Sequence, residues 1–114
     1  MASPSRGEVW LADFGVPIGR ESGMKHPCLI ISDNRLNHGP AELAIVVPMT
    51  SVYKGVPSHF EINPPEGGLK MRSFIKCEDV RSISTKRLMA VWGTVSLKTL
   101  TEVGYRLRLL MNLN

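Results

Sequence analysis

The chain has 114 residues, a length that suits one domain built around one hydrophobic core. Hydrophobic residues make up 43% and charged residues 21%, which is ordinary globular usage and argues against a disordered chain. The longest apolar runs, such as Leu43–Val47, are much too short to cross a bilayer, and residues 1–6 lack the apolar stretch of a signal peptide. We therefore expect a single cytoplasmic domain over residues 1–114 with no membrane segment.

Fourteen Lys and Arg against ten Asp and Glu give a formal net charge of +4, a mild bias that permits binding to a polyanion. The two cysteines, Cys28 and Cys77, form no Cys-x-x-Cys pair, and in a reducing compartment we expect two buried thiols rather than a disulfide. The histidines His26, His38 and His59 lack the spacing of a metal site. We therefore expect neither a metal ion nor another cofactor.

Six apolar segments bounded by turn residues predict short strands. Glycines, prolines and charges over residues 15–25 predict a long loop after the first strand, and long loops on small scaffolds often carry function. The second and third segments are apolar without interruption, which favours central strands, whereas the fourth and fifth alternate polar and apolar residues. The six predicted strands are residues 8–14, 27–32, 43–48, 58–62, 73–78 and 88–93.

The apolar period changes from two to that of a helix after residue 95. Ser96 is a suitable N-cap for this helix. One stripe of the helix would carry the residues Leu97, Leu100, Val103, Leu107, Leu110 and Met111. The sequence therefore predicts a mainly β fold, a small barrel closed by one C-terminal amphipathic helix.

Two polar clusters stand at the ends of the predicted central strands. Lys25, His26 and Pro27 lie where the long loop enters one strand, and Thr50 and Ser51 end the next. If the two strands are neighbours, a cation, an imidazole and two hydroxyls meet at one edge of the sheet. Such a set suits phosphodiester chemistry, because it can move a proton and hold phosphate oxygens. The alternative is an ordinary loop-to-strand junction beside an ordinary strand end.

Four segments in a fixed order resemble the MazF/PemK/Kid family of toxin endoribonucleases. Arg6–Phe14 resembles its opening strand, and Gly19–Ser32 resembles its Gly-x-Glu loop, which leads into Arg-Pro and an apolar strand. Val47–Ser51 resembles the strand that ends in Thr-Ser or Thr-Thr, and Ser73–Ile83 resembles the fourth signature. The similarity runs from about residue 6 to residue 113.

The resemblance implies an SH3-like small barrel of the MazF/CcdB toxin type that forms homodimers. It also implies a sequence-selective endoribonuclease, an mRNA interferase that cuts single-stranded RNA without a metal. In this family the 2′-hydroxyl attacks the adjacent phosphate and leaves a 2′,3′-cyclic phosphate and a 5′-hydroxyl. A cognate MazE-like antitoxin is implied as a further partner, with an acidic tail that occupies the RNA groove.

The catalytic arginine of the family is replaced in this chain. It should precede Pro27, but that position holds His26, with Lys25 before it, whereas Thr50 matches the catalytic threonine and Glu21 the loop glutamate. Three interpretations stay open. The imidazole of His26 transfers the proton, Lys25 supplies the missing positive charge, or the protein is a weakened or inactive enzyme that still binds RNA or antitoxin.

Further residues are candidates for contact with RNA. Arg20 and Lys54 lie on loops that could flank the cleft and hold phosphates, and Ser51 adds a hydroxyl beside Thr50. Glu78 and Asp79 fall where the family has polar residues that contact RNA, which makes readout of base edges possible there. An ion pair between these acidic residues and Arg81 is the structural alternative.

The remaining candidates are expected to have structural roles. Trp10 and Phe14 could stack on bases, but aromatic residues of a first strand are expected in the core. His59 is expected at the surface or at an edge of the sheet, His38 in a turn and Cys77 in the core.

Two other classes of function compete with the nuclease. A CcdB-like topoisomerase poison would share the barrel but bind a protein target and cut nothing. A non-catalytic barrel would bind RNA or protein as a module. Glu21 and Thr50 favour the nuclease, whereas His26 in place of the arginine of the family keeps the other two classes open.

Overall fold

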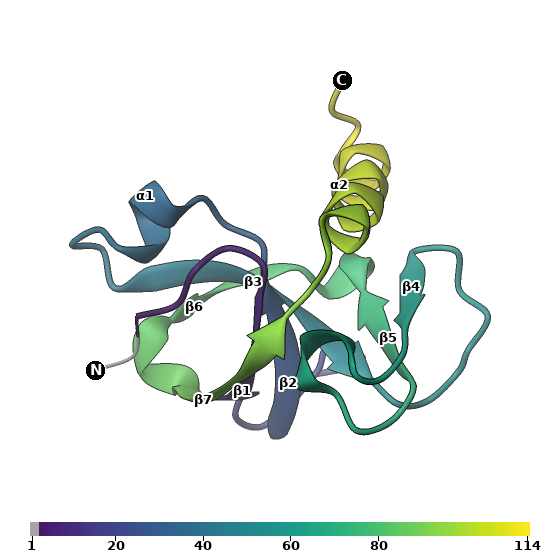
Figure 1. Cartoon of the computed structure of the whole chain (residues 1–114), viewed down its shortest axis with the longest axis horizontal. Coiled ribbons are helices and arrows are strands. Elements are labelled where there is room, and N and C mark those ends of the chain that lie inside the picture. The colour runs from purple at the N-terminus through teal and green to yellow at the C-terminus, as the bar shows by residue number, and fades with distance from the viewer. Residues whose placement is uncertain (1–2) are drawn as a thin grey trace.

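Seven strands and one long helix build the fold in the computed structural model, which describes residues 3–114. The strands are β1 (Glu8–Asp13), β2 (Lys25–Ile30), β3 (Leu43–Thr50), β4 (His59–Ile62), β5 (Ser73–Lys76), β6 (Arg81–Ser84) and β7 (Leu88–Thr94). The helices are α1 (Asn34–Asn37) and α2 (Leu97–Met111), with three single 3₁₀ turns, η1 (Glu66–Gly68), η2 (Cys77–Asp79) and η3 (Thr85–Arg87). The predicted mainly β class with a C-terminal helix is confirmed (Figure 1).

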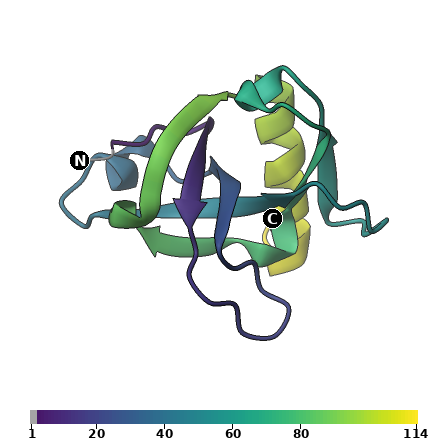
Figure 2. The same cartoon turned by 90° about the horizontal axis from the view of Figure 1, so that it is seen from below.

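The strands form one antiparallel sheet in the order β4-β5-β3-β2-β1-β7, and β6 pairs with β3 outside this path. Strand β3 is the centre of the sheet. Its first half pairs with β6, as Leu43 does with Ser84, and its last residues, Met49 and Thr50, pair with β5. The sheet curves around the core (Figure 2). Within residues 3–114, no pairing between β4 and β7 closes the curved sheet into a complete barrel.

Apolar side chains cover both faces of β2 and β3, which explains their uninterrupted apolar sequence. One face packs Leu29 and Val47 against Val103 of α2. The other face packs Cys28 into a second cluster, and Cys77 joins the first. Both thiols are buried and free, as predicted, and desolvation by burial raises the pKa of Cys28 to about 12 and that of Cys77 to about 11.

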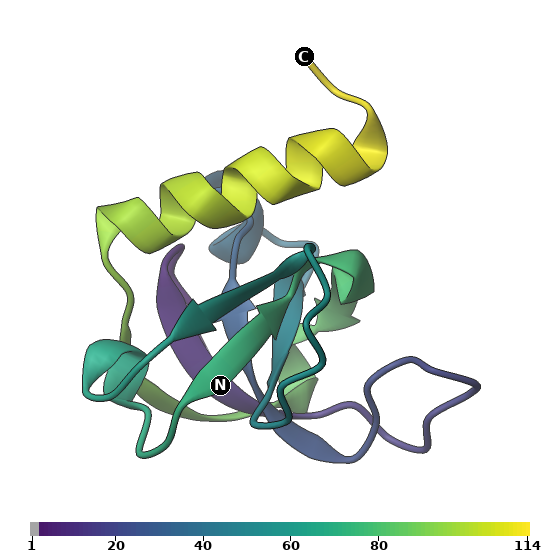
Figure 3. The ribbon, with the colours of Figure 1, turned by 90° about the vertical axis from the view of Figure 1, so that its right-hand side faces the viewer.

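Helix α2 begins at the predicted N-cap, Ser96, and ends at Asn112, which was not predicted. The Ser96 hydroxyl accepts a 3.2 Å hydrogen bond from the Thr99 amide, and Asn112 closes the helix in the left-handed conformation. Only part of the apolar stripe is buried, because Leu97 is 78% exposed and Leu110 is 48% exposed. The helix runs across one side of the strands (Figure 3). No helix within residues 3–114 has the length and apolar character needed to cross a membrane.

Two elements differ from the sequence prediction. Strand β6 was missed because Ile83 is its one buried apolar residue, so its sequence carries little strand signal. Helix α1 was missed because it is a single turn, capped by Asp33, whose carboxylate accepts from the Arg35 amide at 2.8 Å. The predicted strand over residues 73–78 ends at Lys76, where the 3₁₀ turn η2 begins.

Candidate active site

His26 and Thr50 are brought together by the pairing of β2 with β3. The ladder ends at the pair Cys28 and Pro48, and His26 and Thr50 each lie two residues beyond that pair, on the same side of it. Both residues are half-buried, and both line the same cavity. The two predicted polar clusters therefore lie at one edge of the sheet, as the neighbouring-strand interpretation required.

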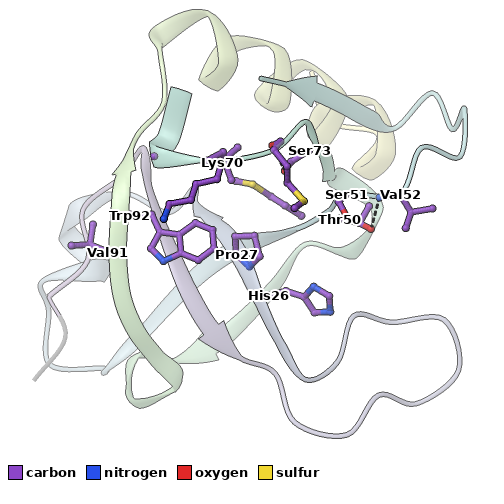
Figure 4. Close-up of a pocket in the computed structure, with 13 residues that line it drawn as sticks. His26, Pro27, Thr50, Ser51, Val52, Lys70, Ser73, Val91 and Trp92 are labelled. Carbon is purple, nitrogen blue, oxygen red and sulfur yellow. Dashed lines mark hydrogen bonds between the residues drawn. The ribbon is translucent and has the colours of Figure 1, made fainter. Parts of the chain in front are cut away.

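The cavity has a volume of about 740 Å³ and lies between β7 and the segment that follows η1 (Figure 4). Pro27 lies between the His26 end and the Trp92 end. Most of the lining is apolar, and it includes no aspartate or glutamate. The lining residues are His26, Pro27, Met49, Thr50, Ser51, Val52, Gly68, Leu69, Lys70, Met71, Ser73, Val91 and Trp92.

The polar groups at this edge of the sheet are available to form hydrogen bonds with a ligand. The Thr50 hydroxyl oxygen accepts a 3.2 Å hydrogen bond from the Val52 amide, which leaves its proton available for donation. Within residues 3–114, the imidazole of His26 has no hydrogen-bond or ion-pair partner. An imidazole can accept or give a proton near neutrality, and a hydroxyl can donate to a phosphate oxygen.

Lys25 is not part of this arrangement. It is exposed, pairs with Asp13 in the β1–β2 ladder, and does not line the cavity. Lys70 supplies a cation to the cavity instead. Sequence reasoning missed Lys70, because a lysine after Gly67 and Gly68 carries no local signal of a site.

Arg20 and Glu21 lie on the loop between β1 and β2, which extends away from the strands (Figure 2). Both are exposed, and the Glu21 carboxylate accepts a 2.9 Å hydrogen bond from the Ile18 amide. Lys54 is likewise exposed, on the segment between β3 and β4. Arg20, Glu21 and Lys54 do not line the cavity, whereas Ser51 does.

Glu78 and Asp79 of η2 are engaged in contacts within the protein. Glu78 accepts from the Ser58 hydroxyl at 2.7 Å and contacts His59 Nε2 at 2.8 Å. Desolvation opposes ionisation, but hydrogen bonds from Ser58 and His59 outweigh it and lower the pKa of Glu78. Asp79 pairs with Lys76 at 3.6 Å.

Arg81 makes no ion pair with either acidic residue within residues 3–114, so that structural alternative was wrong. The Arg81 guanidinium lies 5.4 Å from the centre of the Phe14 ring. Phe14 is buried, as predicted. Trp10 is half-buried. Its indole nitrogen donates a 3.1 Å hydrogen bond to Glu8 Oε1, so the polar group of the ring has its partner within the protein.

His59 lies on β4, at the edge of the sheet, which is one of the two predicted positions, but it is not at the solvent surface. Its side chain is only 4% exposed. Alternation along β4 suggested a solvated position, but the segment that carries Tyr53 and Val56 shares a hollow with His59 and helps to shield it. One ring nitrogen contacts Glu78, and the other is buried without a partner in the described residues.

No group of three His, Cys, Asp or Glu side chains in the described part of the chain is placed to hold a metal ion. The site offers an imidazole, hydroxyls and a lysine beside an apolar cavity.

A family model matches residues 5–111 of this chain. The family is described as PemK-like, MazF-like toxin of type II toxin-antitoxin system. The chain belongs to this family. The match spans both β2 and β3, which carry His26 and Thr50.

Individual members of the PemK/MazF family resemble the chain over most of its length. The endoribonuclease MazF9 of Mycobacterium tuberculosis is 31% identical over 113 residues, which cover 95% of this chain and 96% of that protein. The endoribonuclease EndoA of Bacillus subtilis is 34% identical over 85 residues, which cover 73% of this chain and 72% of that protein. The chain is thus comparable to these relatives in extent.

Solved structures of the family share the fold. The crystal structure of MazF from Deinococcus radiodurans has a TM-score of 0.86 at 23% identity, covering 99% of this chain and 100% of that one. A chain of a MazE–MazF crystal structure from the same organism has a TM-score of 0.79 at 21% identity, with all of both chains covered. At this level of identity, the comparison supports the architecture of the PemK/MazF toxins.

Proposed function

We propose that this chain is an endoribonuclease toxin that cuts single-stranded RNA at selected sequences. The observation that carries the proposal is the placement of His26 and Thr50 at one edge of the sheet, where both line a cavity without carboxylates. RNA is polyanionic, so a lining that contains Lys70 and no acidic residue suits it. The two curated relatives at 31% and 34% identity are endoribonucleases, which supports the same activity.

The proposed reaction is an internal transesterification. The 2′-hydroxyl oxygen attacks the adjacent phosphorus, the bond to the 5′-oxygen breaks, and a 2′,3′-cyclic phosphate remains. His26 takes the proton of the 2′-hydroxyl or delivers one to the leaving 5′-oxygen, and Thr50 donates a hydrogen bond to a phosphate oxygen. Proton transfer and charge stabilisation are thus supplied by His26, Thr50 and Lys70, and we propose that no metal ion takes part.

The other cations have a less direct role in this proposal. Lys25 lies outside the cavity, and Arg20 and Lys54 are exposed on flanking segments. Exposed cations attract phosphates over several ångströms and position them without entering the chemistry. We therefore assign Arg20, Lys25 and Lys54 to RNA attraction, and Ser51, which lines the cavity, to contact with the RNA.

Two protein partners belong to the proposal. Solved relatives include MazE–MazF complexes, and we propose a MazE-like antitoxin whose acidic segment competes with RNA for the cationic surface. We also propose a homodimer, because Leu109 and Leu110 at the end of α2, and Leu113 just after it, are exposed to solvent. Burial of these leucines against a second copy would remove that exposed apolar surface.

The test is to incubate the purified protein with a long single-stranded RNA in the presence of EDTA and to map the product ends. We expect cleavage at a few short sequences, with 2′,3′-cyclic phosphate and 5′-hydroxyl ends. Thr50→Val is the matched control, because it keeps the side-chain shape and lacks the hydroxyl. Intact RNA would contradict the proposal, and intact RNA with arrested topoisomerase would support a topoisomerase poison instead.

A second candidate function is binding without cleavage. It is favoured by one observation, the imidazole at position 26 where the resemblance places the catalytic arginine of the family. Such a protein would hold RNA or antitoxin through the same surface. The two candidates are separated by His26→Arg, because a disarmed toxin would be inert as wild type and would cut RNA only after this change.

A further inference from the structure

The cavity continues well beyond the groups that the proposed reaction uses. At the end away from His26 and Thr50, it is lined by Trp92 of β7, with Lys70 beside it (Figure 4). Trp92 is 41% exposed although it is one of the largest apolar side chains. An aromatic ring left open to solvent on the wall of a cavity is typical of a ligand-binding surface.

The backbone beneath Trp92 is held rigidly. A side chain at Gly68 would place its Cβ 2.0 Å from the Trp92 carbonyl oxygen, and one at Gly93 would place its Cβ 2.6 Å from the Gly68 amide nitrogen. The turn η1 therefore packs backbone to backbone against β7. Glu66, at the start of η1, accepts a 3.0 Å hydrogen bond from the Ser96 amide and fastens this turn to the start of α2. The backbone that carries the Trp92 indole is thus held in place by η1.

The chemistry of the lining selects among possible occupants. An acidic side chain is absent from it, Lys70 stands at the Trp92 end, and His26 stands at the opposite end. The volume of about 740 Å³ lies within the range of small-ligand sites and exceeds what one base requires. A flat apolar ring attached to an anionic backbone matches these features, and that is the chemistry of an unpaired nucleotide.

We propose that Trp92 stacks on a nucleobase of single-stranded RNA, next to the phosphate held between His26 and Thr50. Lys70 would contact the phosphate of the stacked nucleotide. This inference rests on the proposed function, because it takes RNA as the substrate. It assigns to Trp92 a part in choosing where the RNA is cut, since bases differ in stacking strength and in their fit against the apolar lining of the cavity.

The test uses a short RNA that the protein cleaves, with a 2′-deoxy sugar at the attacking position so that it stays intact. In a series of such RNAs, one base at a time is removed to leave an abasic sugar. Trp92→Ala should weaken binding of the complete RNA by roughly 5- to 150-fold, the range typical of one base stacked on an aromatic ring. At one abasic position, wild type and Trp92→Ala should bind equally. Trp92→Phe should keep part of the affinity.

Two controls guard the interpretation. Tyr105, which is 52% exposed on α2 outside the cavity, gives Tyr105→Ala as a matched loss of an exposed aromatic ring. In a Trp10→Phe background, Trp92 is the one remaining tryptophan, and its fluorescence should be quenched by the complete RNA but not by the critical abasic RNA. This second measurement does not depend on the folding of Trp92→Ala.

The outcomes separate the two proposals. If wild type binds and cuts RNA while Trp92→Ala binds every RNA of the series as wild type does, the stacking inference is overturned and the nuclease stands. If wild type neither binds nor cuts RNA, the proposed function fails first. If Trp92→Ala turns a dimer into a monomer with no difference between complete and abasic RNA, the surface holds a second copy and the stacking inference is wrong.

Discussion

The backbone amide of Ser22 donates a 2.7 Å hydrogen bond to the Asp79 carboxylate, although 57 positions separate the two residues. Lys76 completes the contact, because its ammonium donates to the Ser22 hydroxyl at 3.1 Å and pairs with Asp79 at 3.6 Å. The side chains of Lys76 and Asp79 are largely shielded from solvent. The long loop after β1, which carries Arg20 and Glu21, is therefore anchored to η2.

Removal of the Asp79 carboxylate should release the loop. Asp79→Ala should lower the local stability of residues 15–24 by about 1 kcal/mol, because one hydrogen bond and one partly shielded ion pair are lost. The measurement is amide hydrogen exchange at Ser22, which should become several-fold faster. Asp79→Asn retains an acceptor oxygen and should show a smaller change. Unchanged exchange in Asp79→Ala would mean that the loop is held by other contacts.

Thr50→Val should slow RNA cleavage by ~10²–10³, the usual cost of losing one donor to a developing oxyanion. The Val52 amide also loses the hydroxyl oxygen that it contacts, so the thermal midpoint should be recorded beside the rate. Thr50→Ser restores the hydroxyl and should recover most of the activity. A cleavage rate in Thr50→Val equal to that of wild type would remove Thr50 from the reaction.

His26 decides whether the chain is an enzyme in its natural form. If its imidazole transfers a proton, His26→Ala should abolish most cleavage, whereas His26→Arg should retain or raise it. Equal rates for wild type and His26→Ala would make His26 a spectator.

Glu66 should stabilise the fold in a pH-dependent way. Desolvation opposes its ionisation, but hydrogen bonds from Thr99 and Ser96 prevail and lower its pKa from 4.5. Because the folded-state pKa is the lower one, the stabilisation is complete above about pH 4.5 and is lost as pH falls through the lowered pKa. Glu66→Gln should therefore reduce the free energy of unfolding by about 1–2 kcal/mol at pH 7.

Denaturant titrations of wild type and Glu66→Gln at a series of pH values test this prediction. The difference in unfolding free energy should shrink toward zero in acid. A difference that persists unchanged at pH 2–3 would show that it arises from packing rather than from the charge of Glu66.

The exposed end of α2 should hold the homodimer together. Leu110→Glu places a charge among the exposed apolar side chains of the last two turns and should shift the protein toward the monomer in analytical ultracentrifugation. Leu97→Glu, at the opposite end of the same helix, is the matched control and should leave the mass unchanged. A wild type that sediments as a monomer at micromolar concentration would contradict the dimer itself.

Local patterns were sufficient for the parts of the fold that depend on local chemistry. The uninterrupted apolar runs of β2 and β3 predicted central strands, and their polar ends placed His26 beside Thr50. The Ser96 cap and the apolar period predicted α2. Strand β6 could not be predicted from local patterns, because it pairs with β3 through its backbone and buries little of its sequence.

The rest of the candidate site depends on contacts between distant segments. Lys70 and Trp92 meet only because η1 packs on β7, and no periodicity of either segment reveals that approach. Similarly, Asp79 looked like an RNA contact in the sequence but anchors the loop through Ser22. His59 followed the alternation of an exposed strand position, yet a neighbouring segment shields it.

The backbone contact between Gly68 and Trp92 also constrains how this protein can diverge. Any side chain at position 68 would collide with the Trp92 carbonyl oxygen, so position 68 is closed to single substitutions. The rings and methyl groups above it are open, since Trp92, Val91 and Met71 are exposed and contribute little to the core. New preferences for RNA sequences in descendants of this chain should therefore arise by substitution of these three exposed residues, while the backbone contact between positions 68 and 92 is kept.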